Sequence, residues 1–285
     1  MVYADSQSWG KSAFPSVSGT LSFIVPQDTK PVFHSTALTG GEAKLFFEIE
    51  ETSVEVADMR AVEDELSIDR EGFELHRYMT KVDDLYDEVA IKTNYYAEIK
   101  SLLMERFDAS QVHIFDVTRR SDATGGAHNP DGLRKPATRV HVDYTVRSGP
   151  QRARDVFGEQ EYKRLIRVGA HIFQINVWRP ITGPVENSPL ALADAASIAE
   201  DELVATDQVF ADRVGEIYHI AHSVTQHWYY ASQMDRDEVI LIKGWDSIDD
   251  GRALFTPHGA LETIESRHNI LPRESIEVRT FVVIE

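Results

Sequence analysis

The sequence predicts a mostly β protein, a sandwich or barrel of strands with helices packed outside it. Five segments after residue 107 alternate or run apolar in the manner of strands. The longest helical pattern precedes them, over residues 82–107, where apolar side chains recur mostly three or four positions apart. Strand and helix do not alternate strictly, so a parallel α/β sheet is disfavoured.

The elements follow in a simple order. Residues 21–25 and 44–49 are short β-prone runs between glycines and prolines, and an acidic stretch covers residues 58–65. After the helix, strands are expected at 112–117, 139–146, 171–178, 238–243 and 275–284, with helices around 155–168 and 197–207. We expect one domain over residues 1–285, helical and loop-rich to about residue 110, with a β core from about 111.

Composition excludes several classes of function. The net charge of −18 disfavours binding to nucleic acid, and a small organic molecule suits it better as a partner. The absence of cysteine removes disulfides, zinc–thiolate sites and iron–sulfur clusters. No apolar run is long enough for a membrane span, and the polar start lacks the pattern of a signal peptide, so we expect no membrane association and a cytoplasmic location. A homodimer through the helical front half stays open, although no heptad repeat supports it.

The first candidate site is His141-Val-Asp143. On a strand, positions i and i+2 face the same side, so the imidazole and the carboxylate can occupy adjacent coordination positions of one metal. A third ligand from a distant strand would complete a facial triad of two histidines and one carboxylate, which favours iron(II). The alternative interpretation is an exposed strand with two polar residues facing solvent.

The third ligand comes from the remaining histidines. His258, in Phe255-Thr-Pro-His-Gly-Ala260, follows a strong predicted strand and precedes the last one, as the opposite strand of a two-sheet barrel requires. His227, before Trp228-Tyr-Tyr230, is the rival.

Arg273-Glu-Ser275 begins the last predicted strand. A guanidinium and a hydroxyl on one strand face can together hold a carboxylate inside a barrel. Arg279 has the same parity and is a second candidate. A surface charge paired with Glu274 or Glu277 is the alternative for either arginine.

A series of segments in one order carries a family resemblance. They are Asp58-Met-Arg60, Tyr95-Tyr-Ala-Glu98, His141-Val-Asp143, Ile175-Asn-Val-Trp-Arg-Pro-Ile181, His227-Trp-Tyr-Tyr230, Asp237-Glu-Val-Ile-Leu-Ile-Lys243, Pro257-His258 and Arg273-Glu-Ser-Ile-Glu-Val-Arg279. With them the chain resembles the hydroxylase/desaturase family of fungal and bacterial secondary metabolism, which includes gibberellin desaturase-like proteins and a cephamycin methoxylation component.

The resemblance implies a double-stranded β-helix core, the jelly-roll or cupin-like fold, and oxidation with iron(II), 2-oxoglutarate and dioxygen. It also implies that His141, Asp143 and His258 are the metal ligands and the catalytic residues. The residues expected to bind the cosubstrate are Arg273, Ser275, Arg279 and Asn176. The expected lining of the substrate pocket is Trp178, Arg179, His227, Tyr229 and Tyr230.

The predicted function is therefore an iron(II)/2-oxoglutarate oxygenase that hydroxylates, desaturates or oxidatively cyclises a small molecule, in secondary-metabolite biosynthesis. Nothing in the sequence selects among the three outcomes. Two alternatives stay open: a non-catalytic barrel that binds a small molecule, and a cupin-like hydrolase or isomerase that uses zinc or manganese. The pair Arg273 and Ser275 argues against the second, since hydrolysis needs no buried anchor for a carboxylate.

Overall fold

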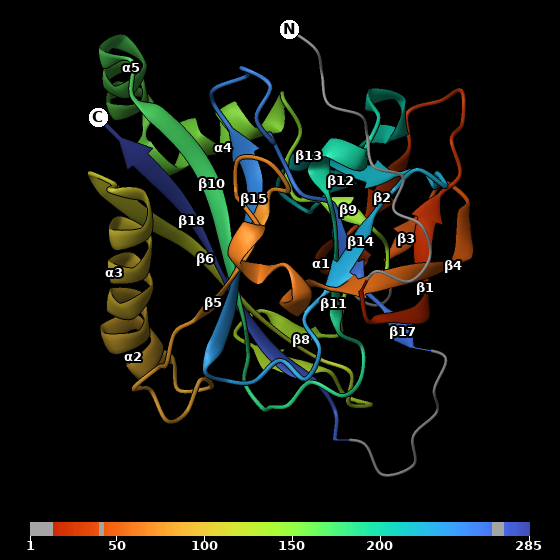
Figure 1. Cartoon of the computed structure of the whole chain (residues 1–285). Helices are drawn as coiled ribbons and strands as arrows, with labels where there is room; N and C mark the ends of the chain where they lie inside the picture. Colours follow the sequence, from red (N-terminus) through yellow and green to blue (C-terminus); the bar gives the residue numbers. More distant parts are fainter. Residues whose placement is uncertain (1–13, 40–42, 264–270) are drawn as a thin grey trace, which may run out of the picture.

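The computed structural model describes residues 14–39, 43–263 and 271–285. It contains two large β-sheets and one small hairpin (Figure 1). Most neighbouring strands are antiparallel, while β2 and β12, and likewise β4 and β14, run parallel. The predicted mostly β architecture with a jelly-roll core is confirmed.

Eleven strands form the major sheet. In spatial order they are β17 (Glu262–Thr263), β1 (Ser16–Ile24), β4 (Ile49–Asp58), β14 (Trp228–Tyr230), β11 (Leu190–Ala193), β16 (His258–Ala260), β9 (His141–Val142), β13 (Val214–Ile220), β12 (Leu203–Val209), β2 (Val32–His34) and β3 (Lys44–Leu45). The minor sheet has the order β5 (Phe73–Arg77), β15 (Glu238–Asp246), β10 (His171–Pro180), β18 (Glu274–Ile284) and β6 (Gln111–Ser121). The hairpin joins β7 (Ala127–Asn129) to β8 (Gly132–Arg134).

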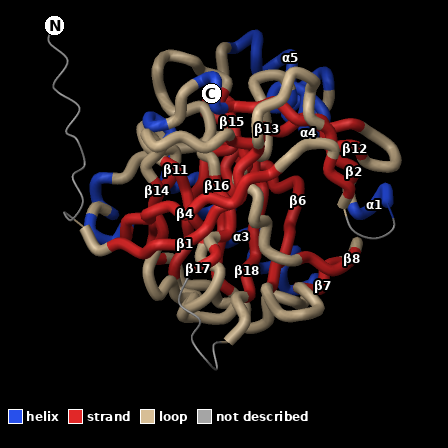
Figure 2. Tube along the Cα trace, turned by 90° about the vertical axis from the view of Figure 1, so that its right-hand side faces the viewer, coloured by secondary structure: helices blue, strands red, loops and turns tan. Residues whose placement is uncertain are grey.

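The helices lie outside the sheets (Figure 1 and Figure 2). They are α1 (Thr36–Thr39), α2 (Glu88–Ala90), α3 (Tyr96–Phe107), α4 (Ser148–Phe157) and α5 (Glu159–Val168), and a π-helical turn, η3 (Ile91–Tyr95), joins α2 to α3. Helices α4 and α5 lie at one end of the molecule (Figure 2), and α3 lies beside the minor sheet (Figure 1). Short 3₁₀ turns are η1 (Met59–Ala61), η2 (Glu63–Glu65), η4 (Ala195–Ser197) and η5 (Glu200–Glu202). Within the described ranges, none of these helices has the length and apolar character to cross a membrane.

The three expected helices differ from the structure, and the strand expected at 139–146 is only β9, His141–Val142. The helix expected at 82–107 begins at Glu88, the start of α2, because the Asp87 carboxylate caps it there. The helix expected at 155–168 is the end of α4 followed by α5, since Gly158 adopts a φ of 80° that ends α4. The helix expected at 197–207 is wrong: after η5 the chain forms β12, whose seven residues pair with β13.

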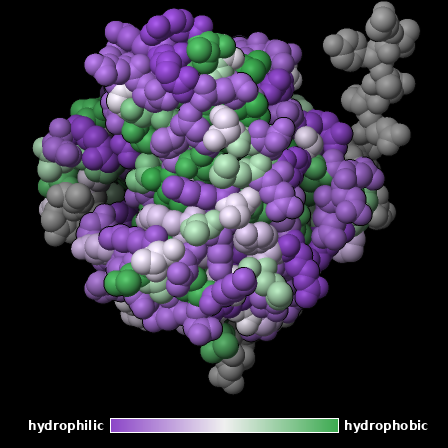
Figure 3. Space-filling view, turned by 90° about the vertical axis from the view of Figure 1, so that its left-hand side faces the viewer, coloured by the Kyte–Doolittle hydropathy of each residue, from purple (hydrophilic) through white to green (hydrophobic). Residues whose placement is uncertain are grey.

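Helix α3 covers the outer face of the minor sheet (Figure 1). Its buried side chains Ile99, Leu102 and Leu103 pack against outward-facing residues such as Ile276 and Val278 of β18. The opposite side of the helix faces solvent, and the surface on this side of the molecule is largely hydrophilic (Figure 3). The helix therefore closes the outer core and leaves the inner face of the sheet for other contacts.

Replacing Leu103 with alanine is expected to lower the free energy of unfolding by about 2–5 kcal/mol, because the side chain is fully buried in this core and its removal leaves a cavity. Denaturant unfolding measures the change. Met104→Ala, at the next position and 43% exposed, is the matched control, expected to change stability by about 0.5 kcal/mol or less. Equal losses in the two variants would contradict this packing.

Side chains on the inner face of the minor sheet form three layers along β10. Ile172 belongs to an apolar cluster that α4 and α5 close at one end, and Trp178 belongs to a second apolar cluster further along. Between them point the buried amides of Gln174 and Asn176. A polar layer thus lies between two apolar ones, and the candidate site is in this layer.

Candidate metal centre

The central strands of the major sheet bring the predicted triad together. Val140 and Val142 pack into an apolar cluster, so His141 and Asp143 face the other side, toward the interior. Strand β16 pairs with β9 through His258 and His141. One ligand atom from each of the three residues lies within 4.8 Å of the others.

Backbone carbonyls orient both imidazoles. The Nδ1 atom of His141 lies 2.9 Å from the carbonyl oxygen of Arg139, and that of His258 lies 3.0 Å from the carbonyl oxygen of Thr256. A carbonyl only accepts hydrogen bonds, so each Nδ1 carries the hydrogen and each Nε2 keeps its lone pair. The rings lie side by side, with centroids 4.6 Å apart. Both Nε2 lone pairs are thereby available to a metal, as in histidine ligands fixed by a second hydrogen bond.

The charge state of the triad suits a divalent cation. Burial opposes the ionisation of Asp143, but the charge of the Arg279 guanidinium outweighs it and holds the pKa of Asp143 well below its usual range. Burial, reinforced by His258, lowers the pKa of His141 well below its ordinary value. An ionised carboxylate beside a neutral imidazole is the protonation state that metal binding requires.

Two neighbours hold the carboxylate in place. Asn176 Nδ2 donates to Asp143 Oδ2 over 2.7 Å, and Arg279 Nε donates to the same oxygen over 3.1 Å. Arg279 also contacts Asp116 at 2.6 Å and Glu277 at 2.7 Å. Of the residues expected at the cosubstrate, Asn176 and Arg279 therefore lie beside the metal ligand, and the donors of Arg279 are already engaged.

Replacing Asn176 with alanine is expected to weaken iron(II) binding about 10- to 100-fold, the usual effect of losing a hydrogen bond to a metal ligand. Anaerobic titration with iron(II) measures the affinity. The exposed Asn94→Ala, on the π-helical turn, serves as the control. Unchanged affinity in Asn176→Ala would mean that this amide does not support the ligand.

Arg273 is a buried cation with an unfilled bonding capacity. Only 3% of it is exposed, Nη1 donates to the Ser188 carbonyl over 2.5 Å, and the guanidinium lies over the Trp178 ring at 5.5 Å. Its buried Nε has no hydrogen-bond partner within the described ranges. Burial, followed by the charge of Arg120, lowers the pKa of Arg273 to about 10. A carboxylate would satisfy this position.

The other predicted residues divide by the direction they face. Ser275 is buried, and its neighbour across the strands is Arg120 on β6. Trp178 and Tyr229 belong to the interior apolar cluster at the site. Of the remaining predicted lining residues, Arg179 and Tyr230 make their contacts away from the triad. Arg179 donates to the Tyr95 hydroxyl over 2.9 Å on the helical side, Tyr230 packs with the other core, and His227 lies in the loop before β14, where its backbone N–H donates to Ser197.

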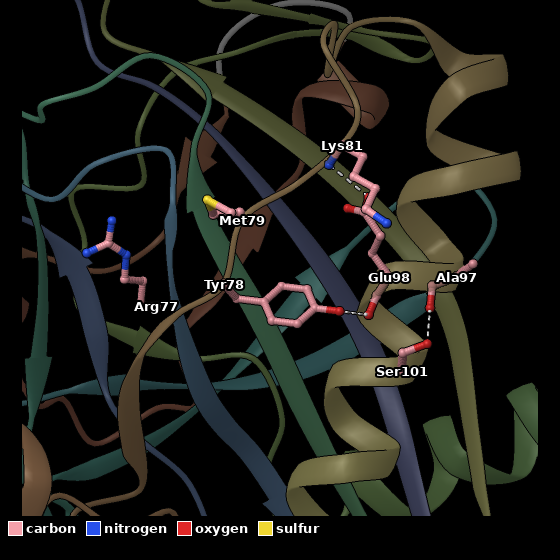
Figure 4. A pocket seen from close by; sticks show the side chains of 7 residues that line it. All are labelled: Arg77, Tyr78, Met79, Lys81, Ala97, Glu98 and Ser101. Atoms are coloured by element: carbon pink, nitrogen blue, oxygen red, sulfur yellow. Dashed lines mark hydrogen bonds between the residues drawn. The ribbon is translucent and has the colours of Figure 1, made fainter.

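A surface groove lies apart from the triad, between α3 and the segment after β5 (Figure 4). Its polar groups contact one another: Tyr78 donates to the Glu98 carbonyl over 3.0 Å, and the Lys81 backbone N–H donates to the Glu98 carboxylate over 2.9 Å. The groove is on the helical side of the minor sheet and shares no residue with the metal centre.

Three interior residues were not predicted from the sequence. Arg120 lies beyond the end of the strand expected at 112–117. His219 has no evident acidic partner in the sequence. Arg139 had a usable signal, because it stands two positions before His141 and shares its parity. Burial, followed by the charge of Arg139, lowers the pKa of His219 to about 3, so the two side chains lie near each other.

Comparison with known proteins finds a matching family model and several similar proteins. A family model described as an oxidoreductase/YMDC permease-like domain matches residues 21–283. Hydroxylase/desaturase CTB9 of Cercospora beticola is 32% identical over 256 residues, covering 83% of this chain and 78% of the relative. Hydroxylase/desaturase efuI of Hormonema carpetanum is 29% identical over 95% of this chain and 96% of the relative.

A solved structure is similar over nearly its whole length. It is described as the iron and alpha-ketoglutarate-dependent endoperoxidase NvfI, with a TM-score of 0.83 and 25% identity over 94% of this chain and 98% of that one. The Fe(II)/2-oxoglutarate-dependent dioxygenase nvfI of Aspergillus novofumigatus is 30% identical over 69% of this chain and 68% of the relative.

Proposed function

The chain belongs to the hydroxylase/desaturase family of Fe(II)/2-oxoglutarate-dependent oxygenases of secondary-metabolite biosynthesis, and we propose that its His141, Asp143 and His258 hold the iron. The observation that carries this assignment is the convergence of these ligand atoms within 4.8 Å, with both imidazoles oriented by backbone carbonyls. Two imidazole nitrogens and one carboxylate leave the open positions that a cosubstrate and dioxygen need. When bound, iron(II) with 2-oxoglutarate supplies the oxidation of an unactivated C–H bond by dioxygen, which releases succinate and carbon dioxide.

The side chains of this protein have three tasks in that reaction. Asn176 and Arg279 keep the Asp143 carboxylate ionised and in one orientation. Arg273 binds the far carboxylate of 2-oxoglutarate, a role supported by its unpartnered Nε and its position over Trp178. Ser275, buried on the same strand, is the proposed second donor.

The apolar cluster around Trp178 and Tyr229 excludes water from the inner end of the site. These two rings are the proposed lining nearest the substrate. Arg179 and Tyr230 make their contacts in other cores, so we assign them to packing. The printed names of the relatives span hydroxylation, desaturation and endoperoxide formation, so family membership defines the oxidation and not its product. The homodimer and the cytoplasmic location stay predictions.

Turnover of 2-oxoglutarate without added substrate tests the proposal. We expect the iron-loaded protein to release slow, iron-dependent succinate from 2-oxoglutarate in air, because the cosubstrate site is complete without a substrate. Mass spectrometry of succinate measures the rate, with His141→Ala as the inactive control. A protein that binds iron and yields no succinate above this control would instead support the non-catalytic binding barrel.

A further inference from the structure

A third histidine continues the row formed by the two ligand histidines. In the major sheet, His258 pairs with His141, and His141 pairs with His219 on the next strand, β13. Residues paired across neighbouring strands face the same side, so His219 also points to the interior. It is 2% exposed and its Nδ1 lies 3.0 Å from the Thr206 hydroxyl. The metal centre therefore has an ordered neighbour on the side away from His258.

Arg139 lies on the same side of the metal centre. It precedes His141 by two positions, and the intervening Val140 packs in the opposite direction. In the described part of the chain, no carboxylate forms an ion pair with its guanidinium and no group accepts a hydrogen bond from it, and its Nε is buried without a partner. A partly buried cation without an anion is costly unless a ligand supplies one.

Aromatic rings lie on one side of this cation. The Arg139 guanidinium lies over the Phe33 ring at 5.6 Å. The His219 ring contacts Phe33 at 5.8 Å and Phe47 at 5.0 Å between centroids. These three rings, tilted by 68° and 50° against one another, form a mostly apolar wall beside a single positive charge. Such a combination suits a carboxylate attached to a planar or apolar body.

The cosubstrate does not account for this position. Arg273 lies at the start of β18, where it contacts the Ser188 carbonyl just before β11. In the sheet order, β11 and β16 lie on one side of β9, whereas β13, β12 and β2 lie on the other, with His219 and Phe33. The two arginines thus flank the triad from opposite sides, and a second anion is expected at Arg139.

We propose that Arg139 binds a carboxylate of the substrate, which is therefore a small carboxylic acid held against Phe33 and Phe47 beside the iron. The inference rests on the proposed function, since the ligand is the substrate of the iron centre. The contact between the His219 Nδ1 and the Thr206 hydroxyl holds this ring in the wall.

A binding experiment with a simple aromatic acid tests the proposal. Manganese(II), which broadens the proton signals of nearby ligands, replaces iron in the full chain, and saturating 2-oxoglutarate fills the cosubstrate site. Benzoate is the anionic probe and benzamide its neutral counterpart of the same shape. We expect saturable broadening of benzoate and little of benzamide in the wild-type protein.

Arg139→Gln is expected to weaken the binding of benzoate at least about tenfold, and Arg139→Lys to keep the preference for benzoate over benzamide. Arg213→Gln is the matched control, because Arg213 also lies over a phenylalanine ring, at 4.1 Å, yet belongs to the exposed turn between β12 and β13. Equal binding of benzoate by Arg139→Gln and wild type would overturn the proposal. So would equal binding of both probes, no binding of benzoate by wild type, or loss of the preference in Arg139→Lys.

A separate measurement distinguishes failure of the Arg139 proposal from failure of the proposed function. The visible absorption band that 2-oxoglutarate produces with iron(II) is expected to be the same in Arg139→Gln and wild type. If wild type gives the band but Arg139 does not select benzoate, only the substrate class is wrong. If wild type gives no band, the proposed function fails and the inference fails with it.

Discussion

His258→Ala is expected to weaken iron(II) binding by more than about 100-fold and to abolish succinate formation. The residue supplies one of three protein ligands, and even losing a hydrogen bond to a ligand costs about 10- to 100-fold. Anaerobic iron titration and succinate release measure the two effects. His128→Ala, on the exposed face of β7, is the matched control and is expected to bind iron normally.

A variant at the alternative third ligand supplies the result that would contradict this prediction. His227 was the alternative third ligand by sequence, and its loop places its backbone against Ser197 and Asp194 rather than in the pairing of β16 with β9. Retention of iron by His258→Ala together with its loss in His227→Ala would contradict the triad assigned here.

Arg273→Gln is expected to raise the KM for 2-oxoglutarate about 100-fold while leaving iron affinity unchanged. The variant removes the charge that meets the far carboxylate, and a hydrogen bond to a charged group contributes up to about 3 kcal/mol. Steady-state succinate formation at varied 2-oxoglutarate gives KM. Arg167→Gln, at an exposed position of α5, is the matched control.

A second arginine variant separates the two cationic roles. Arg279→Gln is expected to weaken iron binding, because its Nε holds the Asp143 carboxylate. If Arg279→Gln raised KM for 2-oxoglutarate and left iron binding intact, while Arg273→Gln did neither, the roles of the two arginines would be exchanged.

The site could be predicted from the sequence better than the elements that carry it. The spacing of His141 and Asp143 predicts a shared strand face, and that held although β9 covers only two residues. Period-two alternation needs no long strand: apolar Val140 and Val142 determine the outward side, and the ligands take the inward one. The pairing of His258 with His141 needed the fold, because the sequence holds several candidate histidines.

The helix expected at 197–207 failed for a physical reason. Acidic residues in η5 give good local helix propensity, but Leu203 and the residues after it complete a ladder with β13. Long-range pairing there outweighs local preference. For Arg139, parity with His141 predicts the interior side of the strand, but only its neighbours Phe33 and His219 in the fold show that its guanidinium is not a surface charge.

The absorption spectrum of the iron(II) protein under anaerobic conditions, before and after addition of 2-oxoglutarate, tests the metal centre most directly. A weak visible charge-transfer band is expected on addition of the cosubstrate, and this band is expected to be absent in His141→Ala and in His258→Ala. Iron binding without the band would contradict the assignment of 2-oxoglutarate to this centre, and absence of iron binding would contradict the triad itself.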